Sequence, residues 1–117
     1  MPSRPGPNRT QAQQTGDRGE DYAARYLQQK GYGLLARNWK LSGQQGGELD
    51  LVMEDGEEIV FVEVKTRTGA FPVRPELAVT PAKARKLART AEAYLHETNQ
   101  GHRPARFDVI AILAQPG

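Results

Sequence analysis

The chain has 117 residues, of which 26% are charged and 38% are hydrophobic, and its formal net charge is +2. This length fits one domain with a modest core, and the composition is ordinary for a soluble globular protein. The absence of cysteine excludes disulfides, zinc–thiolate sites and thiol nucleophiles. No stretch is long or apolar enough to span a membrane, and no apolar signal segment stands at the N-terminus. We therefore expect a cytoplasmic protein that does not associate with membranes.

The two ends of the chain are predicted to be tails. Residues 1–15 contain prolines, glutamines and arginines with almost no apolar side chain, which predicts disorder. We expect a single folded domain over residues 16–114, followed by a short C-terminal tail of residues 115–117.

Gly16–Lys30 has the pattern of a helix, with Asp17 as N-cap and Gly31 as the stop signal. Glu20 stands three residues after Asp17, as in a capping box, and it also falls on the same side as the apolar stripe that begins at Ala23. Glu20 is therefore either a capping residue or part of a functional site, and the sequence leaves both roles open.

Tyr32–Leu41 is predicted to be the first strand, with Leu34 and Leu35 in the core and Trp39 packing at the margin of the sheet. Ser42–Gly47 is a Gly- and Gln-rich loop that leads into an acidic strand. It would shape access to a site on that strand.

The segment from Gly47 to Arg67 consists of two apolar runs around Asp55 and Gly56, which is typical of a β-hairpin. A two-residue turn at these positions places Glu48 opposite Glu63. Alternation along the strands puts four charged side chains on one face: Glu48, Asp50, Glu63 and Lys65. It puts five apolar side chains on the other face, which we predict to be the core face: Leu49, Leu51, Val60, Val62 and Val64.

The acidic face needs a counter-charge, because like charges opposite each other on a hairpin cost roughly 0.2–1 kcal/mol per pair. A hard divalent cation such as Mg²⁺ would remove the repulsion, and such ions are bound by one or two carboxylates with waters and phosphates. Lys65 is placed to orient a metal-bound water or to neutralise charge on a phosphate. The alternative is the solvated face of an amphipathic hairpin. The gathering of charge on one side of otherwise apolar strands favours the metal site.

Thr80–Thr98 is predicted to be the second helix, with Thr80 as N-cap and Pro81 at the first helical position. Its core stripe consists of Ala84, Leu87, Ala88, Ala91, Tyr94 and Leu95. Four cations lie beside this stripe: Lys83, Arg85, Lys86 and Arg89. Cations early in a helix oppose its dipole, which favours contact with phosphates over simple solvation. Arg67 is predicted to lie on the same strand face as Lys65. The sequence favours neither of two roles for it, a phosphate ligand or a surface residue.

Arg106–Leu113 has apolar residues on both faces, which predicts an inner strand covered on both sides. We expect Asp108 to pair with an arginine near the sheet, and both histidines, His96 and His102, to lie on the surface. The order of elements predicts an α/β fold, α-β-β-β-α-β, with a central mixed β-sheet flanked by helices. The third and last strands would run parallel, joined through the second helix.

Asp50 followed by Glu63-Val64-Lys65 resembles the active-site pattern of the PD-(D/E)xK nuclease superfamily, although Leu49 stands before Asp50 in place of proline. A wider match, from about Gly16 to Leu113, resembles the bacterial YraN-type family of predicted endonucleases. It rests on Gly19-Glu20, Asn38-Trp39-Lys40, Gly47–Leu51, Phe61–Arg67, Lys83–Leu87 and Arg106–Val109.

The resemblance implies a restriction-endonuclease-like core and a Mg²⁺- or Mn²⁺-dependent endonuclease acting on DNA, with branched or repair intermediates among the candidate substrates. Asp50 and Glu63 would ligate the metal, with the Val64 carbonyl as third ligand. Glu48 and Glu20 would complete or tune the site, and Lys65 would orient the attacking water. RNA stays open as a substrate. A homodimer is a candidate assembly, since the resemblance extends to resolvases that work as dimers.

Two other functions stay open at this point. One is a non-catalytic nucleic-acid-binding module on a nuclease-like fold. The other is an interaction protein whose acids pair with the cations of a partner. Lys65 and Arg67 disfavour the latter, because an acid-only recognition face would not need them.

Overall fold

The computed structural model describes residues 11–42, 47–68 and 80–114. These ranges contain α1 (Gln11–Gln29), β1 (Gly33–Lys40), β2 (Glu48–Asp55), β3 (Glu58–Thr68), α2 (Pro81–Glu97) and β4 (Ala105–Ala114). The predicted C-terminal tail and residues 1–10 of the predicted N-terminal tail lie outside the described residues. No helix within the described ranges combines the length and apolar character needed to cross a membrane.

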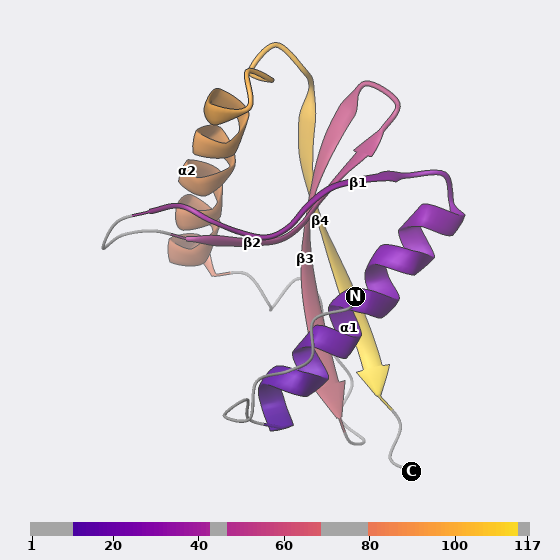
Figure 1. Ribbon diagram of the computed structural model, residues 1–117. Helices are drawn as coiled ribbons and strands as arrows, with labels where there is room; N and C mark the ends of the chain where they lie inside the picture. Colours follow the sequence, from indigo (N-terminus) through magenta and orange to yellow (C-terminus); the bar gives the residue numbers. More distant parts are fainter. Residues whose placement is uncertain (1–10, 43–46, 69–79, 115–117) are drawn as a thin grey trace.

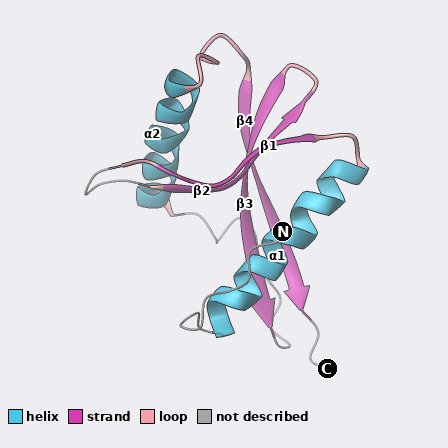
Figure 2. Cartoon of the chain, in the orientation of Figure 1, coloured by secondary structure: helices cyan, strands magenta, loops and turns pink. Residues whose placement is uncertain are grey.

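The four strands form one mixed sheet in the order β1-β2-β3-β4. β2 runs antiparallel to both of its neighbours, whereas β3 and β4 run parallel and are connected through α2. Figure 1 shows a strongly twisted sheet with α1 and α2 on opposite sides, and Figure 2 shows the same α-β-β-β-α-β order by element type. The predicted fold class and the parallel pairing of the third and last strands are confirmed.

Each helix covers one face of the sheet. Along β3, Val60 and Val62 pack in the cluster that contains α1, whereas Ile59 and Phe61 pack in the cluster that contains α2. β2 and β3 are therefore central strands that are buried on both faces. The predicted assignment of all hairpin apolar residues to a single core face is wrong for Leu49, which packs on the α2 side.

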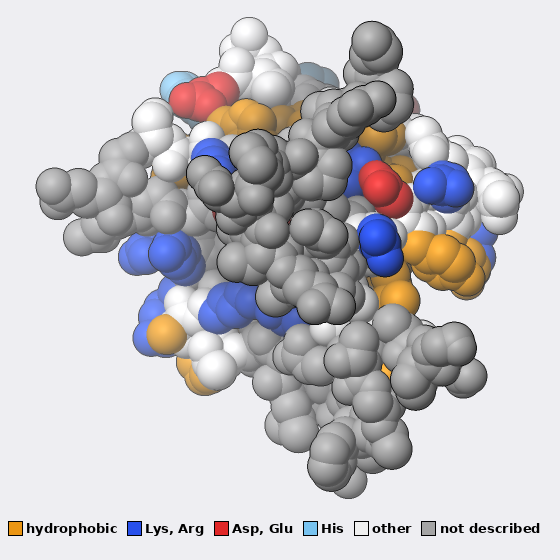
Figure 3. Space-filling model, turned by 60° about the horizontal axis from the view of Figure 1, so that its bottom comes forward, with side chains coloured by type: hydrophobic (Ala, Val, Ile, Leu, Met, Phe, Trp, Pro, Cys, Tyr) orange, Lys and Arg blue, Asp and Glu red, His pale blue; other side chains and the backbone are white. Residues whose placement is uncertain are grey.

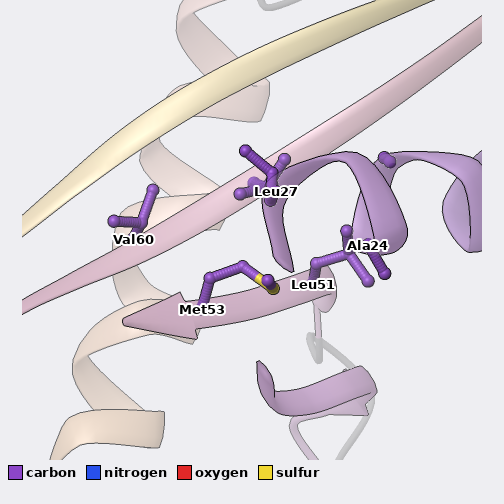
Figure 4. Packing of buried hydrophobic residues seen from close by; sticks show 7 residues of the cluster. Ala24, Leu27, Leu51, Met53 and Val60 are labelled. Carbon is purple, nitrogen blue, oxygen red and sulfur yellow. The ribbon is translucent and has the colours of Figure 1, made fainter. Parts of the chain in front are cut away.

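The core beneath α1 is built from small and aliphatic side chains. Ala24 and Leu27 of α1 face Leu51 and Met53 of β2 and Val60 of β3 (Figure 4). The alanine lets the helix approach the sheet closely, while the larger side chains fill the space between them. This packing fixes the sheet that carries the acidic residues.

The C-terminus of α1 is as predicted. Gly31 adopts φ +98°, and its amide donates to the carbonyl oxygen of Gln28 at 3.0 Å. The amide of Tyr32 donates to the carbonyl oxygen of Leu27, also at 3.0 Å. This is a Schellman motif, in which a glycine in the left-handed region satisfies the last carbonyl groups.

The N-terminus of α1 differs from the prediction. The helix begins at Gln11 rather than Gly16, so Asp17 lies inside the helix, and the predicted N-cap and capping box with Glu20 are wrong. The segment before Gly16 contains Gln and Ala, which are good helix formers. Its polar composition masks that propensity and suggests disorder.

α2 begins as predicted. Thr80 is the N-cap, and its side chain accepts a hydrogen bond from the Lys83 amide at 3.2 Å, with Pro81 following at the first helical position. The core stripe differs in part, because the predicted core residues Ala84 and Ala88 are exposed. The buried residues of α2 are Leu87, Thr90, Ala91 and Tyr94, and the partly buried Leu95 packs against the same cluster, as predicted.

The turn between β2 and β3 lies one residue later than predicted. Asp55 pairs with Glu58, so the turn residues are Gly56, at φ +62°, and Glu57. Moving the turn by one position shifts the pairing by two residues. Because the side-chain period of a strand is two, this shift alone moves no side chain to the other face, and it changes only the cross-strand partners.

β1 and β4 are edge strands, which corrects two predictions. Leu34 and Leu35 of β1 are 39% and 36% exposed rather than in the core. β4 is not an inner strand, and Phe107 on it is 49% exposed. The apolar pattern of both strands resembles that of buried strands, but their place at the margin of the sheet leaves these side chains partly uncovered.

Three smaller predictions are confirmed. Asp108 pairs with an arginine, accepting a hydrogen bond from Arg106 Nε at 3.2 Å. Trp39 packs at the margin of the α2 cluster, with its ring edge-on to that of Tyr94 at a centroid distance of 5.3 Å. Both histidines, His96 and His102, are exposed.

Candidate active site

A cleft of about 750 Å³ opens between the end of β1, the start of β2, the middle of β3 and the first half of α2. Its walls carry both acids and lysines, together with a few apolar atoms. The lining residues are Lys40, Leu41, Gly47, Glu48, Asp50, Glu63, Ala82, Lys83, Lys86 and Leu87. The end of β1, the β2–β3 hairpin and α2 thus bring opposite charges to one place.

Asp50 is fixed at the point where the β2–β3 ladder stops. The last paired residues toward this end are Leu51 and Val62, and beyond them the Val64 amide donates to Asp50 Oδ2 at 2.9 Å. Continued past this pair, the register sets Glu63 across from Asp50. The predicted pairing of Glu48 with Glu63 is therefore wrong, and the two acids of the resemblance, Asp50 and Glu63, are close enough for their charges to interact.

Glu63 is held by two lysines. Lys83 Nζ lies 2.6 Å from Glu63 Oε1, and Lys65 Nζ lies 3.1 Å from the same oxygen. The side chain of Glu63 is only 12% exposed. Because few waters reach this carboxylate, its charge depends on the two ammonium groups, and a burial of this kind is tolerated only when the charge is paired. The solvated-face interpretation of the hairpin is thus wrong for Glu63.

The two carboxyl groups have pKa values that are shifted in opposite directions. Burial raises the pKa of Asp50 to about 6, against the opposing hydrogen bond from Val64, and the charge of Glu63 adds to the rise. Burial acts to raise the pKa of Glu63 as well, but hydrogen bonds from Lys83 and Lys65 outweigh it and hold that pKa below its ordinary value. Paired acids with separated pKa values are typical of functional sites.

The other two predicted acids take different positions. Glu48 lines the same cleft, and its charge also raises the pKa of Asp50. Unlike Glu63, Glu48 is exposed. Glu20 lies on α1, where Oε1 is 3.7 Å from Arg37 Nη2 of β1, and it is not among the residues that line the cleft. Its assignment to the metal cluster stays a prediction.

The predicted nucleic-acid-binding residues divide into three groups. Lys83 points into the acidic site and Lys86 lines the cleft, whereas Arg85 and Arg89 are exposed on α2 outside the lining. The side chain of Arg67 lies outside the described residues. Figure 3 shows Lys and Arg side chains on the left of the molecule, the side on which α2 lies in Figure 1, and others on the right.

Comparison with known proteins assigns the chain to a family. The model of the uncharacterised protein family UPF0102 matches residues 19–112. The chain belongs to the UPF0102 family. UPF0102 protein GSU0650 of Geobacter sulfurreducens is 48% identical over 97 residues, covering 83% of this chain and 73% of the relative. UPF0102 protein STH1475 of Symbiobacterium thermophilum is 43% identical over 106 residues, covering 91% and 86%. The UPF0102 protein of Rhodococcus opacus is 42% identical over 102 residues, covering 87% and 84%.

The donor set of this UPF0102 chain fits a hard divalent cation with few protein ligands. Mg²⁺ is usually held by one or two carboxylates together with waters and substrate phosphates, and Asp50 and Glu63 supply two carboxylates in an open cleft. A cation beside Asp50 would also favour the charged form that burial disfavours. Among the residues that the structure describes, no three His, Cys, Asp or Glu side chains are grouped to hold a metal. The predicted larger ligand set, with Glu48 and the Val64 carbonyl, therefore stays a prediction.

The sequence does not predict the positions of two lysines of the cleft, Lys40 and Lys83. Lys40 reaches it from the end of β1, and Lys83 contacts Glu63 instead of presenting its charge on an outer surface. Lys83 follows the cap of α2 by three residues. The direction of its side chain depends on how α2 packs on the sheet, which no local pattern encodes.

Gly47, which precedes β2 and lines the cleft, lies close to α2. A Cβ atom at Gly47 would lie 2.2 Å from Oγ1 of Thr90, which is 1% exposed. We expect Gly47→Ala to lower the free energy of unfolding by roughly 1–3 kcal/mol, the usual cost of overpacking. Urea denaturation measures this cost. In a Thr90→Ala background the clashing oxygen is absent, so the same substitution should cost only a few tenths of a kcal/mol. An equal cost in both backgrounds would contradict the contact.

Proposed function

We propose that this UPF0102 protein is a metal-dependent endonuclease that hydrolyses phosphodiester bonds in DNA. The observation that carries the proposal is the meeting of Asp50, Glu63 and Lys65 on two neighbouring strands, at a cleft bordered by further lysines. These three residues are the ones whose spacing resembles the PD-(D/E)xK pattern and the YraN-type predicted endonucleases.

Hydrolysis of a phosphodiester requires a cation on the phosphate, a positioned water, and positive charge where negative charge develops. Mg²⁺ or Mn²⁺ held by Asp50 and Glu63 would polarise the phosphate and lower the pKa of a bound water. Lys65 Nζ stays close to the metal-binding carboxylate, 3.1 Å from Glu63 Oε1, and is 19% exposed. From there its ammonium group orients the attacking water and stabilises the charge on the phosphate in the transition state.

The surroundings of the acids suit a polyanion. Lys40 and Lys86 line the cleft, and Arg85 and Arg89 are exposed on the helix that forms its wall. Basic side chains of this kind bind the phosphate backbone without reading the bases, so binding should weaken steeply with salt. A purely acidic site for a cationic partner would have no use for them.

The test is cleavage of labelled single-stranded, duplex, flap and four-way-junction DNA, with an RNA strand included, in Mg²⁺, in Mn²⁺ and in EDTA. The wild-type protein is expected to cut at least one DNA only when metal is present. Asp50→Ala, purified in parallel, is expected to bind that DNA without cutting it, because removing this carboxylate weakens the metal site and leaves the lysines in place. Size-exclusion chromatography with light scattering on the same samples reports whether the active form is a homodimer.

Each outcome decides between the functions. Equal cutting by wild type and Asp50→Ala would identify a contaminating nuclease. Salt-sensitive DNA binding without cleavage in either metal would reject the enzyme and favour a non-catalytic nucleic-acid-binding module. Preferential cutting of the RNA strand would retain the chemistry and correct the substrate.

A further inference from the structure

Lys83 makes the shortest ion pair of the candidate site. It donates from Nζ to Glu63 Oε1 at 2.6 Å, and Lys65 Nζ lies 3.1 Å from the same oxygen. The resemblance to PD-(D/E)xK nucleases gives a role to Lys65 and none to Lys83. One carboxylate oxygen therefore carries two ammonium groups, and one of them comes from a different element, α2.

The place of Lys83 in α2 is unfavourable without an anion nearby. It lies in the first turn, where the helix dipole disfavours a cation, and this turn contains no acidic residue. Its backbone amide is fixed by the hydrogen bond to the capping Thr80. The ion pair with Glu63 offsets the unfavourable position of Lys83, so each residue supplies the counter-charge that the other needs.

A divalent ion and Lys83 compete for the charge of Glu63. Mg²⁺ sits about 2.0–2.1 Å from its ligand oxygens and prefers octahedral geometry, so an ion on Oε1 would displace an ammonium group from this oxygen. An ion on Oε2 would be repelled by the ammonium group that lies 2.6 Å from Oε1 of the same carboxylate. Of the two lysines, Lys83 is the one that can move away from Glu63, since it lines the open cleft and its side chain is 36% exposed. Lys65 is 19% exposed and is not among the lining residues.

We propose that Lys83 is an internal counter-cation that holds the metal position at Glu63, competes with the divalent ion for this carboxylate, and swings into the cleft when the ion binds. In the cleft its ammonium group joins Lys40 and Lys86, where a phosphate of the bound nucleic acid would lie. The inference rests on the metal site of the proposed function. It adds a residue to that site and makes metal binding and the phosphate-binding charge of the cleft interdependent.

The test is calorimetric titration of the full chain with Mn²⁺ alone, at neutral pH and without nucleic acid. Lys83→Met keeps the aliphatic stem and removes the charge, so it is expected to bind Mn²⁺ on the order of tenfold more tightly than wild type, as loss of one charge-assisted hydrogen bond to the competing group implies. Lys86→Met is the matched control, since it removes one positive charge from the same helix and cleft without touching Glu63. Its affinity should stay within about twofold of wild type, because a solvent-exposed charge is largely screened.

Three outcomes would overturn the proposal. An equal gain in Lys83→Met and Lys86→Met would mean that only the net charge of the cleft matters. Unchanged affinity in Lys83→Met would mean that Lys83 does not compete with the ion. A similar gain in Lys83→Arg, which keeps a charged donor, would show that the gain does not arise from loss of the cation. Thermal unfolding verifies that each variant is folded, and Lys83→Gln replaces Lys83→Met if that variant is not.

The result is separable from the nuclease proposal. A tenfold gain with no cleavage of any DNA by the wild type would keep the counter-cation and reject the enzyme. Metal-dependent cleavage by the wild type with unchanged Mn²⁺ affinity in Lys83→Met would keep the enzyme and reject the counter-cation. No Mn²⁺ binding by any variant would reject both the counter-cation and the metal site.

Discussion

Lys65→Ala is expected to lower the rate of metal-dependent DNA cleavage by roughly 10²–10³-fold, which is the usual cost of removing one preorganised electrostatic group from a transition state. DNA affinity should change little, because the lysines that line the cleft, Lys40, Lys83 and Lys86, remain in place to bind the DNA backbone. Lys65 is held by Glu63 at 3.1 Å, so its charge is already in place before substrate arrives. The expected loss is therefore in the chemical step.

Single-turnover cleavage with enzyme in excess measures this step, and a filter-binding or anisotropy titration in Ca²⁺ measures DNA affinity separately. Arg85→Ala is the matched control, since Arg85 is exposed on α2 and does not line the cleft. Arg85→Ala should weaken DNA affinity modestly and leave the single-turnover cleavage rate unchanged. Wild-type cleavage rates in Lys65→Ala would show that the charge on the phosphate is stabilised by another group, for which Lys83 is the nearest candidate.

Local patterns predict those parts of the site that lie on one hairpin. Alternation places Asp50 and Glu63 on a shared face, and this survives the wrong turn assignment, because an error of two residues in register leaves each side chain on its own face. The helix cap at Thr80 and the stop at Gly31 are likewise local, since each depends on a side chain and the few amides or carbonyls beside it.

Long-range packing decides what the sequence does not predict. Whether Lys83 faces solvent or Glu63 depends on the angle at which α2 crosses the sheet. Whether an apolar strand is central or at an edge depends on strand order, and β4 has the apolar residues of an inner strand at an edge position. The burial of Glu63 has the same origin, because α2 covers the face that the hairpin pattern alone would leave to solvent.

Phe61→Ala is expected to lower the free energy of unfolding by roughly 3–5 kcal/mol, as large-to-small substitutions of fully enclosed aromatic residues do. Phe61 is 2% exposed and packs under α2, with its ring edge-on to that of Tyr94 at a centroid distance of 6.0 Å. Removing it leaves a cavity beneath the helix that carries Lys83. Since a domain of this size is stable by only about 5–15 kcal/mol, the loss is a large share of the total.

Phe107→Ala is the matched control, because the same side chain is removed from the paired position on the edge strand. The two rings lie 5.2 Å apart, yet Phe107 is 49% exposed. Much of its surface is already in water, so the expected cost is about 1 kcal/mol or less. Urea denaturation of both variants gives the comparison, with Phe61→Leu as a milder substitution should Phe61→Ala not fold. Equal large costs would place Phe107 in a covered strand, which is what the apolar pattern of residues 106–113 alone predicts and what the strand order β1-β2-β3-β4 contradicts.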